Sequence, residues 1–191
     1  MLSVLGDVLP FAIGVAASAA AVIALILVLQ GPRASSSGIA FTAGWLGGVG
    51  LVVVLGVAFG LAVSDDPARW TQWLKTALGA LLLLAAARKW SQRTPTGSES
   101  APPAWMAGLQ DSAPSKAAIL GFLLGGVNPK NLMLTLGAAA TLGSSGLDST
   151  QLWIVGIAYI VVASLSVLVP LGIYLLMRAK ADHLLADLGV W

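Results

Sequence analysis

Five long apolar segments constrain what this sequence can fold into more than any other feature. They run over Val8–Leu29, Gly38–Val63, Thr71–Ala87, Ala117–Leu142 and Leu152–Met177, and the third is the shortest. A helix needs about 20 apolar residues to cross the hydrocarbon core of a membrane. All five are predicted to be helices, because a spanning segment must satisfy its own backbone groups and strands would give short alternating runs instead.

The balance of apolar and charged residues excludes a water-soluble domain. The 191 residues are 58% hydrophobic and only 9% charged, whereas ordinary soluble domains are about one quarter charged. We therefore predict one transmembrane domain over residues 1–191, an all-α polytopic membrane protein. The net charge of +2 is too small to suggest nucleic acid as a partner.

Lysines and arginines near the segment ends predict the orientation, because cytoplasmic loops carry an excess of them. Seven belong to the loops that follow the first, third and fifth segments: Arg33, Arg88, Lys89, Arg93, Lys116, Arg178 and Lys180. Only Arg69 and Lys75 lie on the other side, beside four aspartates. We expect the N-terminus outside and the residues after Met177 in the cytoplasm.

The third loop contains the one linker. Residues 91–103, SQRTPTGSESAPP, are rich in Ser, Thr and Pro, and such a segment buries too little apolar surface to fold alone. In residues 104–111, Trp105, Met106 and Leu109 have near-helical spacing. Two interpretations stay open for them: a short helix lying at the cytoplasmic interface, or a linker with a loosely anchored tryptophan.

Tryptophans mark the predicted membrane interfaces. Trp45, Trp70, Trp73, Trp90, Trp105 and Trp153 fall near span ends. Aromatic rings of this kind anchor helices at the headgroup level. We expect them to be anchors first and lipid contacts second.

Glycine pairs at four-residue spacing predict close helix packing. The second segment has Gly44 with Gly48 and Gly56 with Gly60, and the fourth has Gly121 with Gly125. Small residues let helix backbones approach closely in lipid. Packing within one subunit is favoured over a homodimer, which stays as an alternative.

A weak internal repeat relates the first and fourth segments. Gly14–Leu25, GVAASAAAVIAL, aligns with Leu124–Thr135, LGGVNPKNLMLT, and pairs Ser18 with Asn128. Three-helix units that begin at these two segments would have opposite topology. Inverted repeats whose broken helices meet near the midplane are a common transporter plan.

A polar island interrupts the fourth segment at Asn128, Pro129, Lys130 and Asn131. Lys130 lies about 13 residues from either end of its segment, where a charge is costly and by default indicates a functional site. Pro129 removes a backbone donor and frees a carbonyl near the weak helix formers Gly125 and Gly126. A kink or unwound turn is expected here. The asparagines then either satisfy freed backbone groups or bind a substrate. The alternative to a functional site is a structural kink in which the lysine pairs with backbone carbonyls.

Residue content argues against catalysis. The chain has no cysteine, and its single histidine, His183, lies beyond the fifth segment without a second ligand or base at metal spacing. No phosphate-binding loop is present. We predict neither enzyme activity, nor a cofactor, nor a metal.

The segment GVNPKNLMLT (Gly126–Thr135) resembles the signature of the Gap/Sap family, the peptidoglycolipid- and sulfolipid-addressing proteins within the lysine-exporter superfamily. Other parts that are similar in order are GPRASSSGIAFTAGWLGG (Gly31–Gly48), WMAGLQDSAPSKAAILGFLLGGVNPKNL (Trp105–Leu132) and ASLSVLVPLGIYLL (Ala163–Leu176), the last with Pro170 in place. The resemblance covers essentially the whole chain. It implies export of envelope glycolipids across the inner membrane.

The sequence departs from the family pattern in two places. Members often carry Ser-Pro-x-Pro in the first helix, where this chain has Ser18 followed by three alanines. We therefore expect the first helix to be less broken than the fourth. Members usually have a sixth helix. Either the sequence is a shortened form, or five helices suffice with a neighbouring protein completing the bundle.

The leading functional hypothesis is an exporter, or essential export accessory, for envelope lipids or glycolipids. Its substrate path would include Ser18, Gly125, Gly126, Asn128, Pro129, Lys130, Asn131 and Pro170, with the lysine binding an anionic part of the cargo. One alternative is a small-solute exporter, whose amino-acid carboxylate would pair with Lys130. Another is a non-transporting scaffold that recruits a lipid synthase or a larger lipid transporter.

Overall fold

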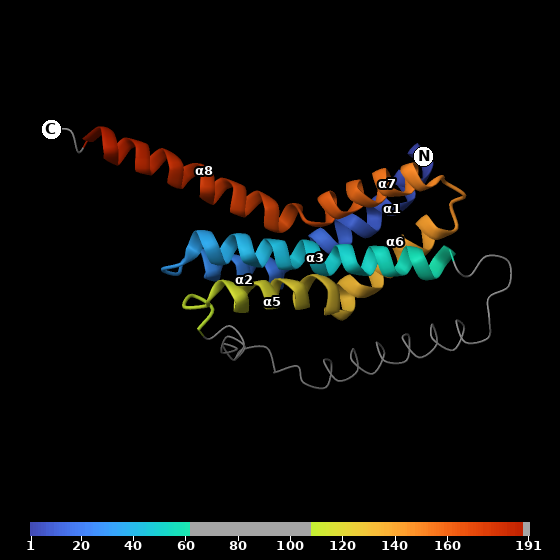
Figure 1. Ribbon diagram of the computed structural model, residues 1–191, viewed down its shortest axis with the longest axis horizontal. Helices are drawn as coiled ribbons and strands as arrows, with labels where there is room; N and C mark the ends of the chain where they lie inside the picture. Colours follow the sequence, from blue (N-terminus) through green and yellow to red (C-terminus); the bar gives the residue numbers. More distant parts are fainter. Residues whose placement is uncertain (62–107, 189–191) are drawn as a thin grey trace, which may run out of the picture.

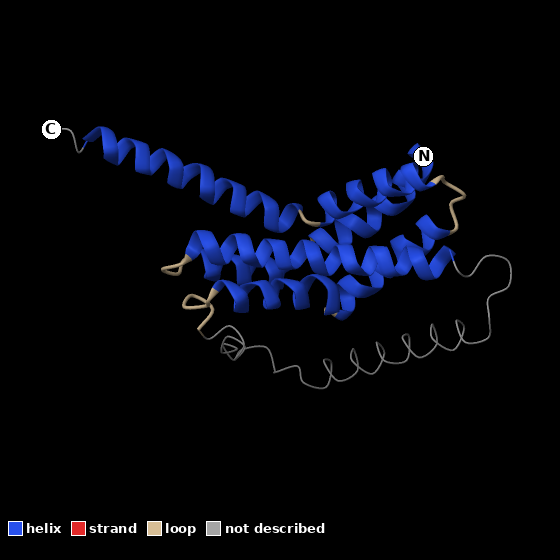
Figure 2. Cartoon of the chain, in the orientation of Figure 1, coloured by secondary structure: helices blue, strands red, loops and turns tan. Residues whose placement is uncertain are grey.

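The computed structural model describes residues 1–61 and 108–188 of the chain. Its helices are α1 (Leu2–Ala16), α2 (Ala19–Leu29), α3 (Ala34–Leu61), α5 (Pro114–Phe122), the π-helical turn η2 (Leu123–Val127), α6 (Pro129–Gly143), α7 (Ser149–Ala163) and α8 (Leu165–Leu188). The part of the chain that is described contains no strand (Figure 2). The predicted all-helical class is confirmed for these residues.

Three of the predicted spans are broken helices, and one is continuous. Helix α3 is long and apolar enough to cross a membrane by itself. The pair α1 and α2 bends by 51°, α5–η2 and α6 by 57°, and α7 and α8 by 64°. Each pair passes the same test of length and hydropathy as one span. The structure therefore has up to four spans among the described residues.

The predicted segments agree with these helices except at their ends and breaks. Helix α3 begins four residues before the predicted Gly38, and α8 continues beyond the predicted end at Met177, so His183 lies on a helix. The third predicted span, the linker at 91–103 and residues 104–107 lie outside the described residues. Residues 108–111 form a turn, so no interfacial helix extends through them.

Helix α3 runs along the length of the bundle and contacts most of the other helices (Figure 1). A seam of glycines joins it to the α5–η2 segment. A Cβ atom at Gly44 would meet the carbonyl oxygen of Ala118, and one at Gly121 would meet that of Phe41. Gly48 and Gly126 likewise bring their backbones together. These glycines allow close packing of helices within one chain, which is the interpretation that the sequence analysis favoured over a homodimer.

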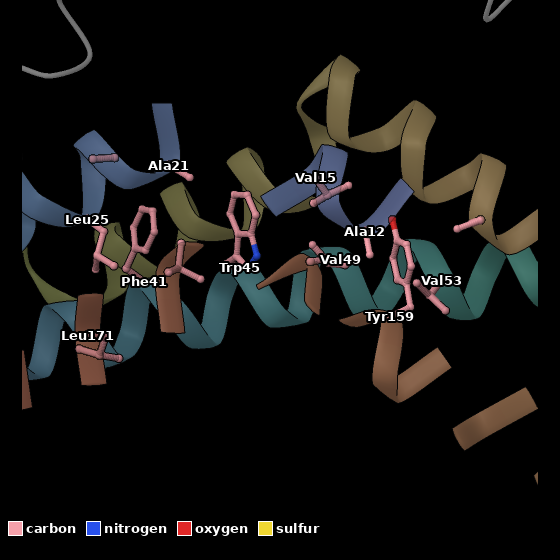
Figure 3. Close-up of a cluster of buried hydrophobic side chains, with 14 of the residues drawn as sticks. Ala12, Val15, Ala21, Leu25, Phe41, Trp45, Val49, Val53, Tyr159 and Leu171 are labelled. Atoms are coloured by element: carbon pink, nitrogen blue, oxygen red, sulfur yellow. The ribbon is translucent and has the colours of Figure 1, made fainter. Parts of the chain in front are cut away.

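The buried core follows α3 and includes one tryptophan that was predicted at an interface. Phe41, Trp45 and Val49 have no exposed surface. In Figure 3, Trp45 lies at the level between Ala21 of α2 and Val15 of α1, where the first broken helix changes direction. The expectation that Trp45 is an interfacial anchor is wrong, because its ring fills the space beside the break. Trp153 on α7 is 61% exposed, as a lipid-facing residue can be.

Large apolar side chains also cover the outside of the bundle. Ile157 on α7 and Leu176 on α8 are more than half exposed, and similar side chains occur on every described span. Soluble monomers rarely expose contiguous apolar surface on this scale. Together with the apolar spans, this surface identifies a membrane protein.

Two of the predicted loop cations, Arg33 and Lys116, lie near one end of the bundle in the part of the chain that is described. The Gln110 side chain donates to that of Gln30 at 3.1 Å, and the Ser37 hydroxyl donates to the Ser112 carbonyl at 2.9 Å. The loops that hold Arg33 and precede Lys116 therefore share one end. Helices α1 and α7 pack together, with Asp148 as the N-cap of α7 near the opposite end (Figure 1). Which end faces the cytoplasm stays a prediction.

Candidate functional site

The break between η2 and α6 arises from Pro129 and its neighbours. The Asn128 N–H donates to the Leu123 carbonyl at 2.9 Å. This bond spans five residues, whereas the bonds of an α-helix span four. The next donor in that pattern would belong to Pro129, which has no N–H, so the Leu124 carbonyl loses its partner. The Asn131 amide donates to this carbonyl at 2.8 Å. The side chain of Asn128 caps α6 by accepting from the Lys130 N–H at 3.1 Å.

We expect Asn131→Leu to destabilise the fold by about 2 kcal/mol, because the Leu124 carbonyl would be left unpaired in a buried site. Asn131 itself has no exposed surface. Asn128→Ala removes a cap at a half-exposed position and should cost about 1 kcal/mol. Thermal unfolding of the purified variants in detergent measures both. Equal losses would show that the carbonyl does not depend on Asn131.

The first span breaks without a proline beside the break, since Pro10 lies inside α1, seven residues before Ala17. The Ser18 N–H donates to the Ala16 carbonyl at 2.7 Å, and Ala17 has φ −73° and ψ 52°. These angles are close to those of an inverse γ-turn. The bend of 51° is smaller than the 57° of the fourth segment, as expected, but the difference is only six degrees, so both helices are clearly broken. The break falls at Ser18, the residue that the internal repeat aligns with Asn128.

Lys130 connects the two breaks. Its ammonium donates to the Ala17 carbonyl at 2.6 Å, across 113 positions of sequence. A cation at the N-terminus of its own helix α6 is disfavoured by the helix dipole, whereas the C-terminus of α1 attracts it. Lys130 thereby supplies a hydrogen-bond donor to the Ala17 carbonyl, which lies at the γ-turn and outside both helices. A tertiary contact therefore joins the break of the first span to that of the fourth.

The residues expected on a substrate path do not all meet. Ser18, Asn128, Lys130 and Asn131 lie at the two joined breaks, and Gly125 and Gly126 pack there against α3. Ser18 is 6% exposed and Asn131 has no exposed surface, whereas Lys130 is exposed among the described residues. Pro170 lies inside α8 and causes no break. The third break is instead at Ser164, six residues earlier.

Besides Asn131, which was predicted as a site residue, other unpaired buried polar groups lie near the level of the breaks, and they were not anticipated. The Trp45 indole nitrogen, the Thr42 and Ser164 hydroxyls and the Asn131 amide oxygen have no hydrogen-bond partner. Gly38 of α3 lies against Leu171 and Gly50 near Ile160, which puts Ser164 near the level of Trp45. No local pattern marks these residues, because a lone serine or tryptophan in an apolar run is ordinary. Unpaired buried groups of this kind call for water, an ion or a ligand.

The sequence matches, over residues 8–191, the model of the family described as Sap, sulfolipid-1-addressing protein. The chain belongs to this family. Comparison with the curated proteins and with the solved structures found no match. Membership in Sap gives the chain a role in lipid addressing or export, and the family is described by that role and not by a catalysed reaction.

The side chains at the two breaks define the chemistry that this site of the Sap protein offers. Within residues 1–61 and 108–188, no cluster of three metal-ligating side chains occurs. The chemistry that remains at the breaks is one ammonium, two amides, an indole and hydroxyl groups. These groups can bind a polar or anionic group by charge and hydrogen bonding.

Proposed function

We propose that the chain is an inner-membrane exporter, or an essential export accessory, for envelope lipids or glycolipids. In this proposal an anionic part of the cargo, a sulfate, phosphate or carboxylate, binds at the two joined breaks. The observation that carries it is the Lys130 ammonium on the Ala17 carbonyl, between two bent helices in the middle of a membrane bundle.

The surroundings of Lys130 favour an anion. Helix α2 begins at Ala19, and its N-cap Ser18 makes no side-chain capping bond. The first N–H groups of a helix have no partner within it and carry partial positive charge. An anionic group beside Lys130 would therefore meet an ammonium together with unpaired backbone donors. Since the local dielectric is low, their attraction is stronger than in water.

Cargo binding and helix bending are coupled in this arrangement. An anion that attracts the Lys130 ammonium competes with the Ala17 carbonyl for the same donor. Once the ammonium leaves, the γ-turn at Ala17 loses its partner from α6, and α1 and α2 are free to change their angle. Bound cargo would then favour one bend angle and empty protein another.

Deletion of the gene tests the proposed function. We expect surface envelope lipids to fall, with accumulation inside, while cytoplasmic amino-acid pools stay unchanged. Lipid extraction from the cell surface and amino-acid analysis of the same cultures provide the measurement. Accumulated amino acids with normal surface lipid would favour the small-solute exporter instead.

A further inference from the structure

A groove on the side of the bundle lies between α3 and α7. Its volume is about 240 Å³. Helix α7 lines it with one face, and α3 adds three valines and an alanine within residues 53–58. The lining residues of α7 are Ser149, Leu152, Trp153, Gly156, Ile157 and Ile160. Their spacing of three and four residues makes a continuous stripe along one side of a helix.

The length and position of this groove match one leaflet of a bilayer. From Ser149 to Ile160 the helix rises by about 16 Å, which is close to half of a hydrocarbon core about 30 Å thick. The Ser149 end lies beside Asp148, a charged N-cap suited to the membrane interface. The Ile160 end lies about one turn from the break at Ser164, near the middle of the bundle.

The floor of the groove is formed by a glycine with space above it. A Cβ atom at Gly156 would have only Val53 within 4 Å, at 3.8 Å, which is ordinary contact. Trp153 and Ile157 at its rim are 61% and 56% exposed. Among the described residues, the groove is therefore open on its outer side and almost wholly apolar.

We infer that the groove holds one acyl chain of the exported lipid. The carbonyl end of the acyl chain lies near Ser149 and its methyl end near Ile160, as for any lipid of that leaflet. This inference rests on the proposed function, because the occupant is identified as cargo. It adds a site for the apolar part of the molecule, separate from the site for its anionic part.

Photolabelling tests the groove directly. The purified full chain is placed in vesicles of phosphatidylcholine and phosphatidylglycerol that contain a trace of phosphatidylglycerol with a diazirine on its acyl chain. After illumination, adducts are mapped by mass spectrometry. A diazirine near the chain end should label the Ile160 end of α7, and one near the carbonyl should label the Ser149 end.

Gly156→Leu should lower this labelling by about fifteenfold, because leucine displaces about two chain methylenes, each worth roughly fourfold in affinity. Gly172→Leu is the matched control, since Gly172 on α8 has nothing within 4 Å of its Cβ position. It should change labelling of α7 by less than about twofold. Thermal unfolding of both variants verifies that they are folded.

Equal labelling of α7 and α8, or labelling that Gly156→Leu does not change, would overturn the inference. So would a crosslink from a photoreactive residue at Ile157 to a second copy or to residues 62–107. Because labelling needs no export, its failure leaves the proposed function standing. If labelling is normal but deletion of the gene leaves surface lipids unchanged, the proposed export function is contradicted, whereas the acyl-chain site is supported.

Discussion

Replacing Lys130 by methionine is expected to lower lipid export by about a hundredfold, since removing one partner of a charge pair held out of water costs roughly 3 kcal/mol or more. Methionine keeps the length of the side chain and removes the ammonium that donates to Ala17. Losing that charge-assisted hydrogen bond should cost about 1.5 kcal/mol, the low end of the range, because Ala17 and Lys130 are both exposed. The variant also no longer places a charge in the membrane, which is favourable. The amount of folded protein should therefore stay near that of the natural chain.

Lys130→Arg distinguishes charge from shape. Arginine keeps the positive charge but presents a planar fork instead of a compact ammonium. We expect partial export activity and normal protein level. If methionine and arginine reduced protein level together while export per molecule stayed unchanged, the contact with Ala17 would be only structural. Surface lipid and membrane protein must be measured on the same cells.

Gly121→Ala is expected to destabilise the bundle by about 3 kcal/mol, the upper end of the usual cost of overpacking. The new methyl group would overlap the Phe41 carbonyl oxygen and crowd the Trp45 nitrogen. Both are backbone atoms of α3, so no side-chain rotation relieves the overlap. Helices α3 and α5 must then separate, and the core around Trp45 loses its packing.

Gly47→Ala provides the control on α3. A Cβ atom at Gly47 would have nothing within 4 Å, and alanine is the better helix former. Its melting temperature in detergent should be unchanged or slightly higher than that of the natural chain, while that of Gly121→Ala falls. Similar melting temperatures for the two variants would mean that α3 and α5 do not pack through this seam.

The features that sequence reasoning could predict are those with a local cause. Apolar segment length gives the helices, and the glycine spacing gives the α3–α5 seam. Pro129 predicts the break near Asn128, because a missing N–H is a property of one residue. The freed carbonyl was also expected, and it belongs to Leu124.

The features that sequence reasoning missed depend on residues that lie far apart in the sequence. The break at Ala17 depends on a lysine 113 positions away, so a run of small residues gives no local sign of it. Ser164 breaks the last span without proline or glycine beside it, while Pro170 continues a helix. In lipid, neighbouring helices can satisfy the groups that a proline frees, so its position alone does not locate a bend.

Chemical restoration of the positive charge at position 130 is the most direct test of whether the ammonium binds the lipid during export. The chain has no natural cysteine, so Lys130→Cys creates one unique thiol. Alkylation with bromoethylamine turns it into a side chain of lysine's length that ends in an ammonium, whereas a neutral ethyl reagent adds similar bulk without charge. In vesicles containing the purified protein, we predict that lipid transfer is absent in Lys130→Cys, returns after aminoethylation and stays absent after ethylation. Equal transfer before and after both treatments would contradict a role for this charge in export.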